Sequence, residues 1–336
     1  MTAAAPITIG PVTSWFPDRT VPVGELPELA ELSNHRRTHA LSLGIDTIRC
    51  AGADTEVDIA AAAATAVLTG AGLAPGEIDA LLLVQGRAPQ YLLASEATRL
   101  QHRLGLRDAF VACVGDLGCV SVSAAFTLAA ALLRGTPGCR TVLVVAAAKT
   151  PTSQRYRAPM TLLGDGGAAV VLSTVRPGRY ELVDHVVRSD GKYADLFRID
   201  YRDRAQAAWS EECASEPDYS FRLAVESKKR FAAMNSELLA GHGTTMSQVD
   251  AVVTQNLSVG AFAFWEEAMD VTIDQVCRRN LAAYGHLGSI DVLVNLEDAA
   301  ATLGGGDHLL VLNSSPVAAW SSSLLRRLSD DAAVRR

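Results

Sequence analysis

The sequence predicts an α/β protein made of two related halves. Three observations support this prediction: a repeated turn and strand pattern, a repeated Leu-Gly triplet that opens an apolar helix, and a short apolar strand after each of those helices. Strands that alternate with helices are typical of mainly parallel sheets with helices on both faces. We therefore expect a duplicated α/β unit.

The first repeated pattern is a turn followed by a buried strand. It occurs as LAPGEIDALLLVQ at 73–85 and again as MSQVDAVVTQ at 246–255, with Asp79 matched by Asp250. An Ala-rich or amphipathic helical stretch precedes each copy. The match between two distant segments indicates duplication.

The second repeated pattern is the triplet that opens a helix. Leu117-Gly118-Cys119 and Leu287-Gly288-Ser289 follow Asp79 and Asp250 at nearly the same spacing, and an apolar strand follows each helix, TVLVVAAA at 141–148 and HLLVLN at 308–313. The segment STVRPGR at 173–179 separates the copies, which predicts halves at 1–175 and 176–336. Equivalent helices could meet on a pseudo-twofold axis and bring 116–119 close to 286–289.

Composition excludes several classes of protein. Of 336 residues, 49% are hydrophobic and 20% charged, as in folded globular chains. A net charge of -7 argues against a nucleic-acid partner, and six scattered cysteines indicate neither a metal site nor a disulfide framework. The start, MTAAAPITIG, is no signal peptide and no apolar run approaches the roughly 20 residues of a membrane span. We expect a cytoplasmic protein with no membrane partner.

Two cysteines compete for the role of nucleophile. Cys119 follows Gly118 and opens the apolar run VSVSAAFTLAAALL, whereas Cys113 lies in FVACVG, the end of a predicted strand. The N-terminus of a helix offers unpaired N–H groups and a positive dipole end, which favour a thiolate and a developing oxyanion. We predict that Cys119 is the nucleophile.

The chain resembles the ketoacyl-acyl carrier protein synthase III family over nearly its whole length. The motifs that carry the resemblance are HRLGLRDAF before the helix-opening cysteine, LLGDGGAAVVLS at 162–173, DAVVTQN, YGHLGS at 284–289 and the closing AAWSSSLL. The resemblance implies a thiolase fold, with the two halves layered α-β-α-β-α. It also implies a catalytic cysteine at the tip of a buried helix.

The chain departs from the family at the groups that support condensation. Condensing members carry a histidine at the place of Gln255 and an asparagine at the place of His286, and these groups stabilise the enolate formed when a malonyl thioester loses carbon dioxide. Here Asp291 follows His286 by five positions. A Cys119, His286 and Asp291 set suits acyl transfer, because the histidine takes the thiol proton while the carboxylate fixes its tautomer.

The resemblance also bears on substrate binding. The second oxyanion donor of the family comes from a glycine-rich turn, where this chain has Ser314-Ser315-Pro316-Val317, and Pro316 has no N–H. We assign substrate binding to Gln255, Asn256, Ser315 and Val317. In relatives that use coenzyme A, a tryptophan near the N-terminus holds its adenine, and LSNHRRTHALSLGI lacks that tryptophan, which argues against coenzyme A. We expect an acyl carrier protein thioester or a coenzyme A thioester as donor, and no cofactor.

Three functions follow, in decreasing order of support. The first is transfer of an intact acyl group to a hydroxyl of a small molecule or to a carrier thiol, in polyketide or antibiotic biosynthesis. The second is the family's decarboxylative condensation, and the third is an inactive partner subunit of a heterodimer.

We also expect a homodimer that pairs through the apolar strand TVLVVAAA at 141–148. The segment 191–220 has no clear periodicity, and we expect it to form a long loop over the site.

Overall fold

A computed structural model describes residues 5–85, 88–317 and 319–329. In the first half, the strands are β1 (Thr8–Ile9), β2 (Thr13–Trp15), β3 (Thr20–Pro22), β4 (Thr47–Arg49), β5 (Ala80–Val84), β6 (Phe110–Val114), β7 (Thr141–Ala148), β8 (Tyr156–Arg157), β9 (Thr161–Leu162) and β10 (Gly166–Ser173). The helices are α1 (Pro27–Ala30), α2 (Asn34–Leu41), α3 (Glu56–Gly70), α4 (Glu96–Leu104) and α5 (Ser121–Gly135).

The second half has fewer and longer elements. Its strands are β11 (Tyr180–Ser189), β12 (Phe197–Ile199), β13 (Glu211–Cys213), β14 (Ala251–Thr254), β15 (His308–Ser315) and β16 (Ala319–Arg327). Its helices are α6 (Ala224–Gly241), α7 (Val259–Met269), α8 (Gln275–Tyr284) and α9 (Asp291–Ala299). The repeated triplets form short 3-10 turns, Gly118–Val120 before α5 and Gly288–Ile290 before α9.

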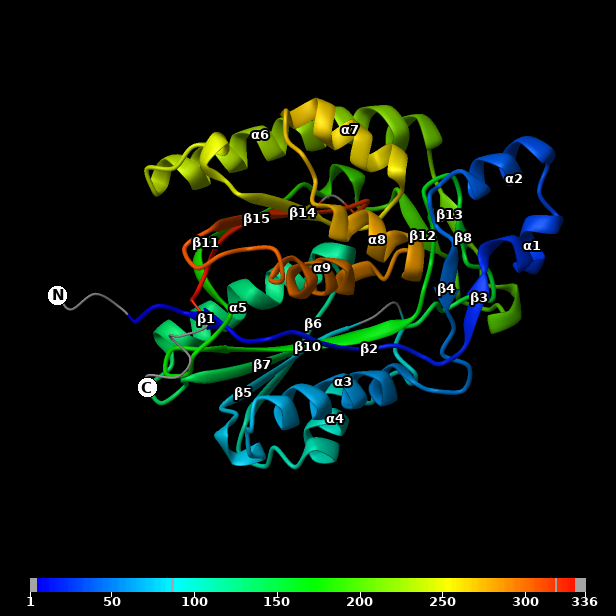
Figure 1. The fold of residues 1–336 in the computed structure, drawn as a ribbon. Coiled ribbons are helices and arrows are strands. Elements are labelled where there is room, and N and C mark those ends of the chain that lie inside the picture. Colours follow the sequence, from blue (N-terminus) through cyan, green and yellow to red (C-terminus); the bar gives the residue numbers. More distant parts are fainter. Residues whose placement is uncertain (1–4, 86–87, 318, 330–336) are drawn as a thin grey trace.

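The elements stack in five layers (Figure 1). Helices α6 and α7 cover one sheet face, α5, α8 and α9 form the middle layer, and α3 and α4 cover the far sheet. The strands form one continuous hydrogen-bonded order, β14-β15-β16-β11-β1-β10-β7-β5-β6, and β1 pairs with β11 of one sheet layer and with β10 of the other. The predicted five-layer α/β fold is confirmed.

The predicted mainly parallel pairing is wrong. Strand β5 pairs in parallel with β6 and β7, and β14 with β15, but β7 is antiparallel to β10, and β16 is antiparallel to β15 and β11. The reason is the connections, because a short turn links β15 to β16 and no helix crosses over between β7 and β10. Such connections leave consecutive strands antiparallel.

Strand β7 lies inside the sheet and is not an edge. It pairs with β5 on one side and with β10 on the other, and all eight of its residues are buried. Val142, Val144 and Ala146 face one hydrophobic cluster, while the alternate side chains face the other. The expectation of a dimer contact through 141–148 is therefore wrong. Among the described strands, β6 ends that sheet.

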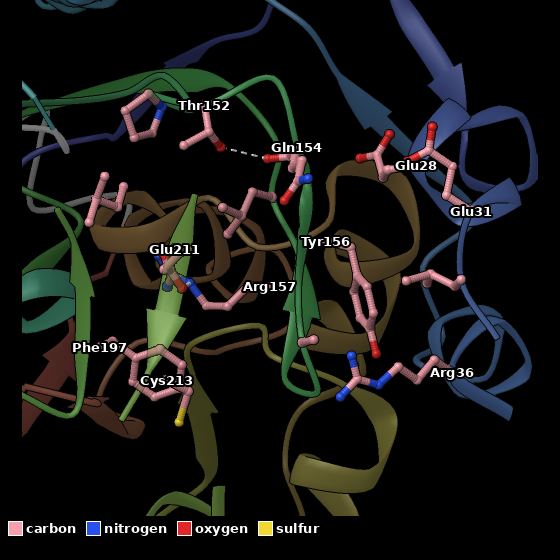
Figure 2. A pocket seen from close by; sticks show the side chains of 15 residues that line it. Glu28, Glu31, Arg36, Thr152, Gln154, Tyr156, Arg157, Phe197, Glu211 and Cys213 are labelled. Atoms are coloured by element: carbon pink, nitrogen blue, oxygen red, sulfur yellow. Dashed lines mark hydrogen bonds and ion pairs between the residues drawn. The ribbon is translucent and has the colours of Figure 1, made fainter. Parts of the chain in front are cut away.

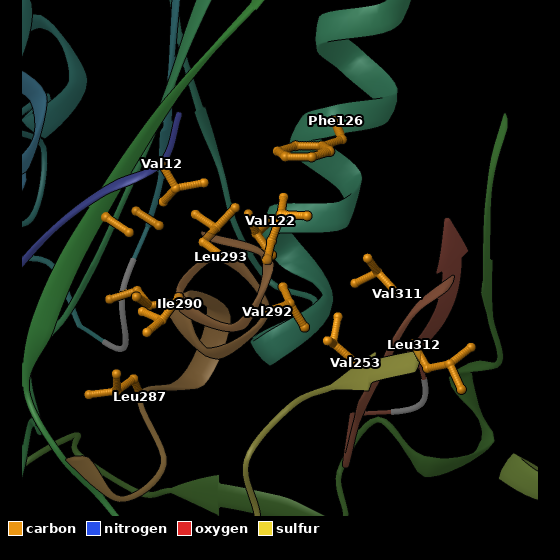
Figure 3. Packing of buried hydrophobic residues seen from close by; sticks show 14 of the residues in the cluster. Val12, Val122, Phe126, Val253, Leu287, Ile290, Val292, Leu293, Val311 and Leu312 are labelled. Carbon is orange, nitrogen blue, oxygen red and sulfur yellow. The ribbon is translucent and has the colours of Figure 1, made fainter. Parts of the chain in front are cut away.

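The middle layer carries the core. Figure 3 shows Val122 and Phe126 of α5 packed beside Ile290 and Leu293 at the start of α9. The stretch Gly118–Gly135 is, among the described residues, the one helical segment long and apolar enough on length and composition to cross a membrane, and half of it is buried. Its position between two sheets is that of a core helix.

The duplication extends to individual hydrogen bonds. Asp79 Oδ2 accepts from the backbone N–H of Thr141 at 2.9 Å, at the start of β7, and Asp250 Oδ2 accepts from His308 N at 2.7 Å, at the start of β15. Each aspartate therefore ties the turn before one strand to the start of a parallel neighbour of that strand in the sheet. The boundary between 175 and 176 falls in the connection from β10 to β11 and stays a prediction.

Candidate active site

Cys119 lies in the 3-10 turn that opens α5. Gly118 has φ +55°, and a Cβ there would lie 2.4 Å from Ser315 Oγ, so the position requires glycine for both conformation and space. Asn313 Nδ2 donates to the Cys119 carbonyl at 2.8 Å and fixes the turn against β15. The cysteine is buried, with 5% of its surface exposed.

His286 reaches the same point from the other half. Helix α8 ends at Tyr284, and Gly285 follows with φ +68°, where a Cβ would lie 2.7 Å from the carbonyl oxygen of Leu162. The N–H of His286 donates to that same oxygen at 2.8 Å. This backbone places His286 Nε2 3.2 Å from Cys119 Sγ. The two helix-opening turns thus meet, as the repeat predicts.

Asp291 completes a line of three buried side chains. Its Oδ2 accepts from His286 Nδ1 at 2.5 Å and from Asn256 N at 2.9 Å, while Oδ1 accepts from Leu287 N at 2.8 Å. Because a carboxylate only accepts, it holds a proton on Nδ1 and leaves Nε2 to face the thiol. The structure brings Cys119, His286 and Asp291 together, and their roles in catalysis stay predictions.

The three groups shift one another's pKa. Burial by itself raises the pKa of Cys119, but His286 lowers it by charge and by hydrogen bonding, and the net result is a lowered pKa. Burial lowers the pKa of His286, and Asp291 and Cys119 together raise it to about 9. Both shifts favour a thiolate beside an imidazolium, the reactive form of a cysteine nucleophile.

Comparisons with known proteins identify the family of the chain. Residues 116–191 match the family described as 3-oxoacyl-[acyl-carrier-protein (ACP)] synthase III. The beta-ketoacyl-[acyl-carrier-protein] synthase III of Cereibacter sphaeroides is 30% identical over 328 residues, which cover 94% of this chain and 97% of that enzyme. The chain belongs to the synthase III family.

Solved structures show the same thiolase fold. ChlB3, described as an acyltransferase, superposes with a TM-score of 0.81 at 24% identity and covers 96% of this chain and 98% of that one. The 3-oxoacyl-[acyl-carrier-protein] synthase III of Aquifex aeolicus superposes with a TM-score of 0.79 at 19% identity, with coverages of 95% and 99%. The fold and the resemblance predicted from the sequence are confirmed.

In this synthase III family member, Gln255 and Asn256 have partners within the protein. Gln255 Nε2 donates to Ser314 Oγ at 2.6 Å, and Gln255 Oε1 accepts from Ser314 N at 2.8 Å. Asn256 is buried, and its Oδ1 accepts from Asn295 Nδ2 at 2.8 Å. Both residues brace the strand end beside Asp291. Their contact with substrate stays a prediction.

Ser315 and Val317 flank the residue before the nucleophile. Ser315 is buried, its Oγ accepts from Val317 N at 3.4 Å, and both side chains lie against Gly118. They therefore border the turn that carries Cys119. Their substrate contacts also stay predictions.

Cys113 lies apart from this cluster. It is on β6 with its Sγ 3.7 Å from Gln85 Oε1. The residue is exposed as a whole, but its thiol is partly covered by protein, and this partial loss of water raises its pKa. The opposite pKa directions of Cys113 and Cys119 agree with the choice of Cys119. A cysteine nucleophile needs a basic partner, and the side-chain amide of Gln85 beside Cys113 is not a base.

A cavity of about 310 Å³ is lined in part by Leu163, whose backbone pairs with that of His286, while Cys119, His286 and Asp291 are not among its lining residues (Figure 2). Part of its lining comes from the segment 191–220, which is not the plain loop expected, because β12 and β13 pair within it. Among the lining residues are Arg157 and Glu211, which point toward one another. Sequence reasoning missed this pair, and no local signal joins residues so far apart in the chain.

Proposed function

We propose that this synthase III family member is an acyltransferase that loads an acyl group onto Cys119 and passes it on intact. The observation that carries the proposal is the continuous hydrogen-bonded line from Cys119 Sγ through His286 to Asp291, with the latter two side chains fully buried. A nucleophile, a base and a group that orients the base are the parts that acyl transfer requires.

The geometry supports two successive transfers. In the first, His286 Nε2 takes the proton of Cys119, the sulfur attacks the thioester carbonyl, and the donor thiol leaves with the proton from Nε2. In the second, Nε2 takes the proton of an acceptor hydroxyl or thiol, the acceptor oxygen or sulfur attacks the acyl carbon, and Cys119 leaves. Asp291 stabilises the imidazolium in both steps.

The state of Gln255 argues against decarboxylation. Both ends of its amide are hydrogen-bonded to Ser314, so it offers no donor in place of the histidine that condensing relatives carry. Stabilising an enolate needs donors aimed at its oxygen, and losing one costs on the order of 100-fold to 1000-fold in rate. Decarboxylative condensation remains the second candidate, because the curated relatives are named as ketoacyl synthases.

The names of similar proteins support the donor and the setting. The relatives act, by name, with an acyl carrier protein, so we propose an acyl carrier protein or coenzyme A thioester as donor. Structural neighbours include a tetronic acid condensing enzyme and the priming ketosynthase of the R1128 polyketide pathway. These names are compatible with a role in natural-product biosynthesis and a small-molecule acceptor.

The test uses a malonyl thioester labelled in its free carboxyl carbon. After incubation, intact mass and peptide mapping are expected to find the whole malonyl group on Cys119 and none on Cys113, and the product formed with a hydroxyl acceptor keeps the label. Release of labelled carbon dioxide at the rate of product formation, with a new carbon–carbon bond, would contradict the proposal. An acyl group on Cys113 would overturn the site.

We also propose a homodimer, now through β6. That strand pairs only with β5 among the described strands, and Phe110 at its start is 56% exposed. An unpaired apolar edge is a ready template for pairing with a second copy. Sedimentation at micromolar concentration is expected to show a dimer that Phe110→Glu weakens. Phe264→Glu, at an exposed residue of α7, is the matched control, and a wild-type monomer would refute the proposal.

A further inference from the structure

Arg157 and Glu211 form an ion pair that the proposed transfer steps do not use. Arg157 Nη2 donates to Glu211 Oε2 at 2.6 Å, and Arg157 Nε faces Glu211 Oε1. The two side chains are only 12% and 20% exposed, and they join β8 to β13. Removing these two charges from water costs free energy, so the ion pair is poorly explained as a contribution to stability alone.

The pairing uses only one edge of the guanidinium. Arginine has five N–H donors in one plane, and Glu211 faces Nε and Nη2. Within the described part of the chain, Nη1 has no hydrogen-bond partner. The other edge therefore remains open to a second carboxylate, in the two-point geometry that arginine and carboxylates favour.

Arg157 is also close to the reacting groups. It lies opposite Thr161 in the β8–β9 hairpin, and the next residue, Leu162, accepts the backbone hydrogen bond of His286. The same side chain borders the cavity of about 310 Å³. Its positive charge contributes to the lowered pKa of Cys119, after the larger effects of burial and His286. The guanidinium of Arg157 thus borders the cavity and also acts electrostatically on the thiol of Cys119.

We propose that Arg157 determines acyl specificity by binding the free carboxylate of a dicarboxylic acyl group, such as malonyl, carried on Cys119. The inference rests on the proposed acyl-enzyme but not on the fate of its acyl group. Glu211 holds the guanidinium in place and balances its charge while the site is empty. The open edge of Arg157 then takes the substrate carboxylate.

This contact would also protect the acyl group. Loss of carbon dioxide breaks the carbon–carbon bond between the carboxylate and the neighbouring carbon. The electron pair of that bond moves onto the neighbouring carbon, and the carboxylate that Arg157 binds is lost. Ion pairing with Arg157 stabilises the carboxylate before that step and not after it, so the barrier to decarboxylation rises. The pair and the hydrogen-bonded Gln255 act in the same direction, toward transfer of an intact acyl group.

The test compares acylation of Cys119 by malonyl and butyryl thioesters, measured as intact mass in single-turnover mixing. We use N-acetylcysteamine thioesters, which carry no phosphate, beside the coenzyme A thioesters. The wild-type protein is expected to prefer malonyl with both carriers. Arg157→Gln is expected to lower the malonyl-to-butyryl ratio by about 10-fold to 100-fold, the usual effect of one charged hydrogen-bonded contact.

Two further variants keep the result decisive. Arg157→Gln with Glu211→Gln removes the charge without leaving an unpaired carboxylate, and it is expected to show the same loss of preference. Arg36→Gln, at the exposed arginine that also lines the cavity, is expected to keep the wild-type ratio. The proposal fails if the wild type has no malonyl preference, or if Arg157→Gln slows malonyl and butyryl acylation equally. An equal slowing that is confined to the two coenzyme A thioesters would assign Arg157 to phosphate. Carbon dioxide release with an intact preference would refute only the proposed function.

Discussion

Replacing His286 with alanine is expected to abolish turnover, with a loss of about 10³-fold to 10⁴-fold in kcat, the upper part of the range for a general base. Both half-reactions, acylation of Cys119 and transfer to the acceptor, should be slowed. The reason is that His286 Nε2, 3.2 Å from Cys119 Sγ, takes the thiol proton in the first and the acceptor proton in the second. Separate single-turnover measurements of acylation and of transfer to the acceptor test this expectation. Slow acylation with normal transfer would contradict the shared base.

The pH dependence adds a second readout for His286→Ala. In the wild-type protein, the thiolate and imidazolium coexist from the lowered pKa of Cys119 up to the pKa of His286, about 9, so acylation is fast near neutral pH. Without His286, burial dominates and raises the pKa of Cys119. The acylation rate of the variant should therefore still rise with pH above 9. His242→Ala, at a partly exposed histidine that pairs with Asp184, is the control and should leave the profile unchanged.

Asp291→Asn is expected to lower kcat by about 10³-fold to 10⁴-fold, because an amide in place of the orienting carboxylate allows the wrong histidine tautomer. Asp291 is also one of the groups that raise the pKa of His286 against the effect of burial. Loss of the carboxylate therefore lowers the pKa of His286, and the imidazolium loses its proton at a lower pH. Acylation of the variant should then begin to slow at a lower pH than acylation of the wild type, on the alkaline side of the profile. Steady-state rates and the pH profile of acylation measure both effects.

The structure also predicts a cost in stability for Asp291→Asn. Both oxygens of Asp291 accept backbone N–H groups, from Asn256 and Leu287, and an asparagine amide must turn its NH₂ group toward one of these donors. One unsatisfied buried group typically costs about 1–3 kcal/mol, which thermal unfolding resolves. Asp298→Asn, on the same helix but near the surface, is the matched control for activity. If Asp291→Asn unfolds at the wild-type temperature and turns over at the wild-type rate, the assignment of Asp291 is wrong.

Local sequence was sufficient for the parts of the fold that depend on local pattern. The two copies of the turn and strand, at 73–85 and 246–255, became β5 and β14, and both Leu-Gly triplets opened helices. Gly118 and Gly288 have positive φ because a sharp turn must precede each helix. The prediction that Cys119 and His286 meet followed from the repeat, since equivalent turns in duplicated halves lie together at the pseudo-twofold axis.

Other features depended on contacts between distant segments. Whether β7 or β6 forms the edge is decided by which strands pair with them, and both read as apolar runs in the sequence. The hydrogen bonds between the Gln255 amide and Ser314 join the ends of β14 and β15, and no local sequence pattern predicts them. Arg157 and Glu211 meet across 54 residues of chain. Each of these contacts depends on how the elements pack.

The sequence by itself therefore predicted the duplicated α/β design from its periodicity and helix-opening turns. Together with the family resemblance, it also predicted the set of Cys119, His286 and Asp291 that the structure brings into contact. Only the tertiary structure decided the mixed strand directions, the exposed edge at β6 and the charge beside the cavity. The physical reason is that strand order and buried ion pairs are set by which distant surfaces exclude water together. A local stretch of chain does not contain that information.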